Sequence, residues 1–235
     1  LRPKVDGRVG EIPLRTPMLN IETVGAGGGS IAFIDSGGAL CVGPKSAGAD
    51  PGPAAYGKAG VNAQATVTDA NVVLGRIPNL LGGSMAIDHG AAEAAIARVA
   101  EKLAATVMDT AKAIVSIAES TMVRACKNIC MSQGVDPREL ALVAFGGAGG
   151  LHGCAVAEQL GCKAVLFPAN SGVLSAQGIQ NAPIQSSASR SYFVDSRELE
   201  SGQLCLDLEN SLTKLKSECE LQGNLQTTIY LDCRL

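Results

Sequence analysis

The residues best suited to chemistry in this sequence form a glycine-rich turn, GGAGG, at positions 146–150. The apolar run ALVAF precedes it at 141–145, and the small-residue segment LHGCAVAEQL follows at 151–160. This order predicts a buried parallel strand, a turn and a helix. Such a turn leaves backbone N–H groups free at a helix N-terminus, where they can bind a phosphate or a nucleotide. Glycines also permit tight packing of a helix on a sheet, and the spacing alone leaves both interpretations open.

The turn fits neither of the two common phosphate-binding motifs. It lacks G-x-G-x-x-G with an acidic residue on the next strand, and it lacks the lysine of a P-loop. His152 follows the turn directly. Its imidazole could contact a nucleotide or a substrate, or it could cap or pack the start of the helix. His89 lies beside a predicted helix cap, and we expect it to be an ordinary surface residue.

Two acidic residues upstream are further candidates for a site. Asp50 lies in the segment SAGADPGPAAYGKAG, residues 46–60, whose four glycines and two prolines exclude a regular element. An ordered loop of this composition is costly to hold in place, which favours a functional role for Asp50. Asp69 follows a short strand-like stretch in ATVTDANVVLGRI, and it is either a site residue or a helix cap.

The eight cysteines are scattered through apolar segments, and the sequence contains no N-x-[ST] sequon. This pattern predicts reduced core thiols in a cytosolic protein rather than a disulfide scaffold. Cys126 and Cys130 are four residues apart on a predicted helix, a spacing that a metal could use. Cys126 belongs to an apolar stripe and no third ligand is close in sequence, so we expect both to be core residues. We expect the same of Cys154 and Cys162.

Composition excludes several classes of partner. The chain has 235 residues, of which 46% are hydrophobic and 17% charged, so it can bury a sizeable core. The net charge is −3 and no Lys/Arg cluster is present, which argues against nucleic acid. No apolar run reaches the length of a membrane span, and the N-terminal sequence LRPKVDGRVG lacks the pattern of a signal peptide. We therefore expect a cytoplasmic protein with neither a membrane nor a nucleic-acid partner.

Strand patterns flank the candidate residues on both sides. The segments SIAFID and ALCVGP on either side of SGG predict a hairpin over residues 30–44. The segment KAVLFP at 163–168 predicts a second buried strand, which completes a β-α-β unit with a right-handed crossover. Residues 171–179, SGVLSAQGI, again offer small residues after a strand end.

Two helices with apolar faces separate the hairpin from the β-α-β unit. We expect Asp88 to cap the first and Asp109 to cap the second, which should end at Gly134. The first apolar face consists of Ala92, Ala95, Ile96, Val99 and Leu103. The second consists of Ile114, Ile117, Ala118, Met122, Ala125, Cys126 and Ile129. The length of the second helix predicts a buried scaffold element.

Four segments closely resemble the hydantoinase A/oxoprolinase family. They are TVGAGGGSIAFIDSGGALCVGPKSAGADPGPAAYG (23–57), TVTDANVVLGR (66–76), DPRELALVAFGGAGGLHGCAVAEQLG (136–161) and ANSGVLSAQG (169–178). That family includes ATP-dependent N-methylhydantoinase A subunits, 5-oxoprolinase, and related subunits of acetone and acetophenone carboxylases. The resemblance covers nearly the whole chain to about residue 180. It implies that residues 1–182 are the C-terminal part of the family's ATPase-like domain and that 183–235 begin its C-terminal α+β region.

In the second part we expect a polar strand at 183–194, a charged helix over 195–222 and a further strand from 226. Leu204, Leu208, Leu212 and Leu215 should line the inner side of that helix. Both ends of the sequence look cut, so we expect a fragment of a longer protein.

The resemblance also implies a fold and a set of site residues. The family looks like the actin, sugar-kinase and heat-shock-chaperone ATPases, which have a ribonuclease H-like mixed sheet flanked by helices. The adenosine-binding turn of that fold would fall on Gly146, Gly147, Ala148 and Gly149, with His152 nearby. A second backbone loop facing the cleft would consist of Gly25, Gly27, Gly28, Gly29 and Ser30. Asp50, Asp69 and Asn71 would be polar residues of the cleft, with Asp50, Asp69 and His152 as the catalytic candidates.

The activity that the resemblance implies is ATP-dependent opening of a cyclic amide of the hydantoin or 5-oxoproline type, with Mg²⁺ on the phosphates. It also implies a hydantoinase B-type partner subunit or domain, and we expect an oligomer. The alternatives are a ketone carboxylase subunit and a non-catalytic fragment that binds only nucleotide or a partner chain.

Two features depart from the family pattern. The D-x-G-G-T phosphate loops are missing and should lie upstream of residue 1; DSGGAL at 35–40 echoes them but lacks the threonine, so we interpret it as the hairpin turn. Ala55 stands where family members often carry cysteine, so we expect no thiol nucleophile there.

Overall fold

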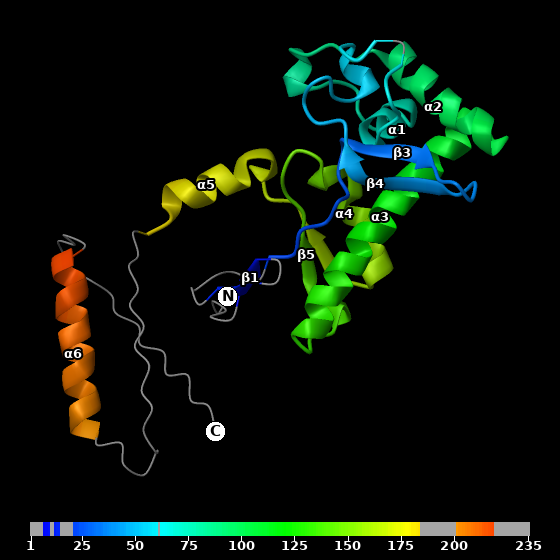
Figure 1. Cartoon of the computed structure of the whole chain (residues 1–235). Helices are drawn as coiled ribbons and strands as arrows, with labels where there is room; N and C mark the ends of the chain where they lie inside the picture. Colours follow the sequence, from blue (N-terminus) through cyan, green and yellow to red (C-terminus); the bar gives the residue numbers. More distant parts are fainter. Residues whose placement is uncertain (1–6, 10–11, 15–20, 61, 184–200, 219–235) are drawn as a thin grey trace. The chain divides into compact units, whose positions relative to one another are not determined.

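The computed structural model of the chain describes residues 7–9, 12–14, 21–60, 62–183 and 201–218 (Figure 1). The chain divides into two compact units, Leu1–Gln177 and Gly178–Leu235. The first unit is mixed α/β, whereas the described residues of the second unit are mainly helical. None of the described helices is long and apolar enough to cross a membrane.

The first unit begins with two antiparallel strand pairs. The strands β1 (Gly7–Val9) and β2 (Ile12–Leu14) pair with each other, and β3 (Ser30–Ile34) pairs with β4 (Leu40–Ser46). The second pair confirms the predicted hairpin. Asp35 forms its turn, because its Oδ1 accepts hydrogen bonds from the N–H groups of Gly37 and Ala39, each at 2.9 Å. The interpretation of DSGGAL as a turn is therefore confirmed.

Three helices carry the core of this unit. They are α1 (Val67–Val73), α2 (His89–Leu103) and α3 (Val107–Ser132), with short 3₁₀ turns η1 (Ala54–Tyr56) and η2 (Leu81–Gly83) in the connections. Their buried side chains form the main apolar cluster together with Ala32 of the hairpin. Figure 1 shows α3 in green as the long central helix, with the hairpin toward one end and β5 toward the other.

The helix caps confirm one prediction and correct another. Asp88 caps α2, since its Oδ1 accepts a hydrogen bond from the N–H of Ala91 at 2.8 Å. Asp109 does not cap α3; the cap is Thr106, whose hydroxyl accepts from the Asp109 N–H and donates to the Asp109 carboxylate. The Thr106 hydroxyl satisfies the N–H of the third helical residue, so the helix begins after Thr106 and Asp109 lies within its first turn.

The predicted apolar faces of α2 and α3 are largely confirmed. On α2 the four residues Ala92, Ala95, Ile96 and Val99 are buried, and Leu103 is half-buried. On α3 the residues Ile114 and Ala118 are fully buried, whereas the part of the stripe from Met122 onward is half-buried. Gly134, with φ +64°, follows the end of the helix as predicted.

The remainder of the unit contains the predicted β-α-β arrangement. After η3 (Pro137–Glu139), β5 (Ala141–Val143) leads to α4 (Gly149–Leu160) and β6 (Ala164–Leu166), and η4 (Ser171–Val173) precedes α5 (Leu174–Asn181). The strands β5 and β6 pair in parallel, with Leu142 opposite Val165. Leu142 packs with the α3–α4 cluster of Val123, Val156 and Leu160.

The prediction that both of these strands are buried is wrong. The opposite face is open: Val143, Phe145 and Leu166 are 45%, 49% and 52% exposed. The physical reason is that, among the described residues, helices cover only one side of this two-stranded sheet. The expected single mixed sheet is also not formed among the described residues, whose strands make three separate two-stranded sheets. The hairpin and the parallel pair each bury one face in a different apolar cluster.

In the second unit, α6 (Ser201–Glu218) lies within the helix predicted over 195–222. Leu208 and Leu212 are half-buried on it. The predicted strands over 183–194 and from 226 lie outside the described residues, apart from the first residue of the former.

The cysteines among the described residues are free thiols, and Cys154 and Cys205 are exposed, which differs from the prediction of core thiols. Cys126 and Cys162 are half-buried in the α3–α4 cluster, and burial raises the pKa of both thiols. Cys154 is exposed rather than a core residue, because it lies on the side of α4 that faces away from α3 and the strands.

Candidate active site

The glycine turn connects β5 to α4 and leaves the start of that helix uncapped. The N–H of Ala144 donates to the carbonyl of Leu166 at 2.9 Å, and the N–H of Gly146 donates to the carbonyl of Ser171 at 2.8 Å. Ala148 is the N-cap residue of α4, and among the described residues no side chain caps this helix; the N–H of Leu151 donates to the Ala148 carbonyl at 3.1 Å, which leaves the N–H groups of Gly149 and Gly150. The first N–H groups of a helix have no partner within it, so this end presents donors and a partial positive charge.

The turn glycines are not required by packing within the described chain. A Cβ atom added at Gly146, Gly147 or Gly150 would meet no described atom within 4 Å. Gly146 is needed for its conformation, with φ at +87°, whereas Gly147 and Gly150 have no such requirement. The surface of the turn is therefore bare without an internal reason, which favours the ligand-binding interpretation over the packing one.

The glycine that packing does require lies one turn further on. A Cβ atom at Gly153 would stand 2.7 Å from Cβ of Ala144 and 3.0 Å from the ring of Phe167. Gly153 thus allows α4 to approach the strands closely. From the sequence, tight helix–sheet packing was considered only for the glycines of the turn. The signal for such packing was a glycine in the middle of the helix, Gly153.

His152 lies in the interior, against α3. It is 3% exposed, and its Nδ1 lies 3.2 Å from Oε1 of Glu119, which is 7% exposed. Nη1 of Arg76 lies 3.9 Å from the same carboxylate oxygen. Glu119 was not predicted as a site residue; the available signal was an acidic residue within the apolar stripe of a helix. The contact directs the His152 side chain toward α3. The catalytic role of His152 stays a prediction.

Asp69 is fully buried and holds two parts of the chain together. Its carboxylate accepts hydrogen bonds from the N–H of Ala55 at 2.7 Å, from the N–H of Thr66 at 2.8 Å and from the Thr66 hydroxyl at 2.7 Å. Thr66 is the N-cap of α1, so Asp69 is the third helical residue of a capping box and not the cap itself. These contacts tie the η1 loop to α1, and they favour a structural role for Asp69 over a catalytic one.

Burial raises the pKa of Asp69 above its ordinary value, and the hydrogen bonds from Ala55 and Thr66 offset only part of this effect. The folded protein therefore binds a proton more readily than the unfolded chain does. It follows that this carboxyl favours folding most below its unfolded pKa, and that this contribution is lost as pH rises through the folded value.

We predict that the unfolding free energy of the native protein, relative to Asp69→Asn, decreases as pH rises above about 3.8. Urea unfolding of both proteins across the acidic range measures this slope. Asp35→Asn is the control with the opposite sign, because hydrogen bonds from Ala39 and Gly37 lower the pKa of Asp35. A native protein that gains stability over Asp69→Asn with rising pH would contradict the assignment.

The two other polar candidates lie in different surroundings. Asn71 is 1% exposed on α1, where its Nδ2 donates to the Val67 carbonyl at 3.0 Å and its Oδ1 has no partner among the described residues. Asp50 is exposed on the loop that precedes η1. The structure therefore brings Asp69 and Asn71 together on α1 and leaves Asp50 at the surface.

The loop Gly25–Ser30 is held against β4 and α1. The carbonyl of Gly28 accepts hydrogen bonds from the N–H and the hydroxyl of Thr68, at 2.8 and 2.9 Å. A Cβ atom at Gly28 would lie 2.8 Å from that hydroxyl oxygen, and one at Gly29 would lie 2.6 Å from Oγ of Ser46. Close approach thus explains these two glycines, whereas a Cβ atom at Gly27 would meet nothing described within 4 Å.

The same loop borders a shallow hollow of about 220 Å³. Ser30 stabilises the loop, since the Oγ of Ser30 accepts a hydrogen bond from the N–H of Gly27 at 2.9 Å. The loop therefore has a fixed backbone and an open side. This geometry does not test the prediction that the loop faces a cleft.

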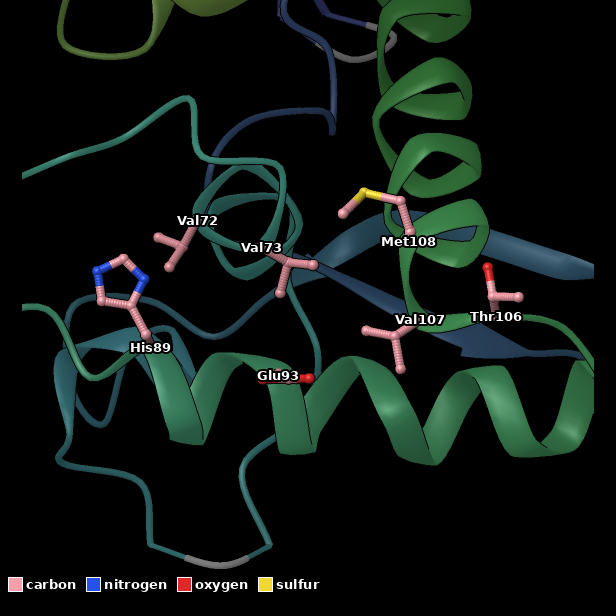
Figure 2. Close-up of a pocket in the computed structure, with 7 residues that line it drawn as sticks. All are labelled: Val72, Val73, His89, Glu93, Thr106, Val107 and Met108. Atoms are coloured by element: carbon pink, nitrogen blue, oxygen red, sulfur yellow. The ribbon is translucent and has the colours of Figure 1, made fainter.

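A larger depression of about 430 Å³ lies between α1, α2 and the start of α3 (Figure 2). Figure 2 shows Val72 and His89 toward one end and Val107 and Met108 toward the other, with Glu93 on α2 between them. None of the predicted site residues lines this depression. His89 is exposed, as predicted.

The described part of the chain holds no group of three or more His, Cys, Asp or Glu side chains that could bind a metal ion.

Comparison with known proteins decides the family. The profile described as Hydantoinase/oxoprolinase matches residues 2–187. The chain belongs to the hydantoinase/oxoprolinase family. Caprolactamase subunit alpha of Pseudomonas jessenii is 46% identical over 165 residues, which are 69% of this chain and 23% of that protein. The crystal structure of ATP-dependent caprolactamase from the same organism matches with a TM-score of 0.72 at 35% identity, over 91% of this chain and 32% of that one.

Two further relatives of the hydantoinase/oxoprolinase chain have other activities in their names. The 5-oxoprolinase PfmaA of Pestalotiopsis fici is 42% identical over 182 residues, 72% of this chain and 14% of that protein. A nucleotide-free structure of acetone carboxylase, described under ATP-dependent acetone carboxylation, matches with a TM-score of 0.77 at 26% identity, over 92% of this chain and 31% of that one. The chain thus spans less than a third of the length of each of these proteins.

Proposed function

We propose that this chain forms part of an ATP-dependent cyclic amidohydrolase and that its glycine turn binds the nucleotide. The observation that carries the proposal is the bare, uncapped start of α4, where Gly147 and Gly150 are needed neither for packing nor for a positive φ. A ligand that lies against the backbone explains them. The similarity to caprolactamase and 5-oxoprolinase supports a ring amide as substrate.

Under this proposal Gly146, Gly147, Ala148 and Gly149 hold the adenosine end of ATP, in an actin/sugar-kinase-like fold. The loop Gly25–Ser30 would face the same nucleotide with its backbone. Bound ATP would supply the phosphoryl group that turns a poor ring carbonyl into a better electrophile. The chain's own contribution under this proposal is to position the nucleotide through the backbone of the glycine turn.

Under the same proposal, the exposed and the buried polar candidates have different roles. Asp50 is the one catalytic candidate at the surface, where it is free to meet a substrate or a partner chain. Asp69 and Asn71 support the site from within. We also propose a partner subunit and an oligomer, in line with the word subunit in the name of the caprolactamase relative.

The second candidate function is ATP-dependent carboxylation of a ketone, which the similarity to the acetone carboxylase structure favours. Phosphate release by the full-length natural protein and its partner separates the two. Release with caprolactam, hydantoin or 5-oxoproline, independent of bicarbonate, supports the hydrolase. Release that needs acetone or a related ketone together with bicarbonate supports the carboxylase. Nucleotide binding without turnover of any of these would leave a non-catalytic binding role.

We predict that Gly147→Val weakens the binding of an ATP analogue at least about tenfold, equivalent to about 1.4 kcal/mol. The new side chain would occupy the bare surface of the turn but would meet no described atom of the protein. Its unfolding free energy should change by no more than about 0.5 kcal/mol. Calorimetric titration and urea unfolding measure the two quantities.

Gly178→Val is the matched control, because Gly178 has equally open surroundings on α5 and lies outside the proposed site. It should leave the affinity unchanged. Equal affinities of the native protein and Gly147→Val would remove the turn from the nucleotide site.

A further inference from the structure

The imidazole of His152 is a buried polar group close after the glycine turn, in the first part of α4. Its Nδ1 contacts Oε1 of Glu119 at 3.2 Å, and its buried Nε2 has no hydrogen-bond partner among the described residues. The two side chains are only 4% and 9% exposed. A buried polar pair of this kind is costly to assemble, so its position beside the proposed site calls for an explanation.

The contact fixes the protonation of the imidazole. An ionised carboxylate only accepts hydrogen bonds, so Nδ1 of His152 must be the donor. A doubly protonated ring would leave a buried N–H at Nε2 without an acceptor, whereas the neutral ring leaves only a lone pair there. The contact therefore favours a proton on Nδ1 of His152, donated to Glu119.

Glu119 joins three elements through its carboxylate. It lies on α3, it accepts from His152 in the first turn of α4, and Nη1 of Arg76, just beyond the end of α1, lies 3.9 Å away. Arg76 is 45% exposed at this distance, so its attraction to Glu119 is weak. The main effect of Glu119 is consequently on His152.

Apolar contacts hold α4 along its length, and the contact of His152 with Glu119 adds a polar link near its start. Val156 and Leu160 pack against Val123 of α3. Leu151 is partly buried against the cluster around Val72. The bond between Glu119 and His152 is the polar link between α3 and the first turn of α4, three residues after Gly149. Loss of this link would remove the polar support of the first helical turn, while the apolar contacts of Leu151, Val156 and Leu160 stay in place.

We propose that Glu119 is a positioning residue for the nucleotide site: it locks the His152 tautomer and thereby fixes the glycine turn. The proposal rests on the function proposed above, because it assumes that the turn binds nucleotide. Glu119 touches neither the nucleotide nor the substrate in this account. It acts through His152, so its effect should appear in the tautomer of that residue as well as in affinity.

The test compares the native protein with Glu119→Gln, which keeps the shape and removes the charge. The chain contains two histidines, so selective ¹⁵N-histidine labelling yields two imidazole spin systems, with exposed His89 as the reference. Native His152 should show a protonated Nδ1 and a bare Nε2. In Glu119→Gln the population of this tautomer should fall, and affinity for an ATP analogue should fall about fivefold or more, while circular dichroism stays native-like.

Two further variants keep the test specific. Glu158→Gln removes a negative charge from the exposed side of α4, and it should change neither the spectrum nor the affinity. Arg76→Gln should leave the His152 tautomer in place, because the bond to Glu119 is retained. If Glu119→Gln proves too unstable to study, the native spectrum alone still decides the tautomer.

The outcomes separate this proposal from the proposed function. A native His152 protonated on Nε2, or a Glu119→Gln variant with unchanged tautomer and affinity, would overturn the positioning role alone. Absence of nucleotide binding by the native full-length protein would overturn the proposed function, and the positioning role with it, whatever the spectrum shows.

Discussion

Asp69→Ala is expected to lower the free energy of unfolding by about 3–5 kcal/mol. The substitution removes the acceptor of three hydrogen bonds in the interior. It leaves the N–H groups of Ala55 and Thr66 without a partner where water does not reach, and Ala55 itself is 0% exposed. It also removes the capping box at the start of α1. Chemical denaturation followed by circular dichroism measures the loss.

Asp35→Ala is the control for this prediction. Asp35 also accepts two backbone hydrogen bonds, but it does so in the exposed hairpin turn, where water can replace it. Its loss should therefore have a much smaller effect. If the two variants lose similar stability, the contacts of Asp69 are not the anchor of the η1 loop. If Asp69→Ala is fully stable but inactive, the catalytic interpretation of Asp69 regains support.

Gly153→Val is expected to destabilise the protein by about 3 kcal/mol, because it forces side-chain atoms into a contact that is already closed. Even the first added carbon would lie 2.7 Å from Cβ of Ala144, and it would press on the ring of Phe167. Relief requires α4 to move away from β5 and β6. The apolar contacts of Val156 and Leu160 would then be weakened as well. Thermal or urea unfolding measures the change.

Gly147→Val provides the contrast, since the same substitution six residues earlier meets no described atom. The pair separates the two reasons for a glycine near this turn. Gly153→Val should lose stability, and Gly147→Val should lose only affinity. A stable Gly153→Val variant would show that α4 can shift on the strands at little cost. An unstable Gly147→Val variant would show that the turn packs against parts of the protein beyond the described residues.

The local pattern of the chain predicted most of its elements. Alternating and apolar segments located the hairpin and the parallel pair β5–β6, and Asp88 marked the start of α2. These features depend on neighbours within a few residues. The capping threonines Thr66 and Thr106 were missed, although their spacing from Asp69 and Asp109 is a local signal.

Features that depend on tertiary contacts could not be predicted in this way. The partner of His152 lies 33 residues away on another helix, and nothing local marks Glu119 as that partner. The one-sided burial of β5 and β6 was also out of reach, because an apolar run indicates the potential for burial and not which helices cover it. The exposure of Cys154 follows from the rotation of α4, which is set by the contacts of Gly153 and Val156.

The candidate site shows the same division. The glycine turn was identified from its sequence, and its bare surface agrees with the ligand-binding interpretation. For the loop Gly25–Ser30 the family resemblance implied a loop facing the cleft, but three of its glycines, Gly25, Gly28 and Gly29, are explained by close contacts with β4 and α1. Whether a glycine serves a ligand or a neighbour depends on what faces it, and this is not encoded in the spacing of the glycines.

The measurement that tests the central claim most directly is calorimetric titration of a non-hydrolysable ATP analogue. It should be carried out on the full-length natural protein and on the 235-residue chain in parallel. We predict tight binding by the full-length protein and weaker binding by the chain alone, because the chain spans less than a third of the matched structures and, under the proposed function, contributes the glycine turn to a larger site. Absence of binding by both would contradict the assignment of the glycine turn to a nucleotide.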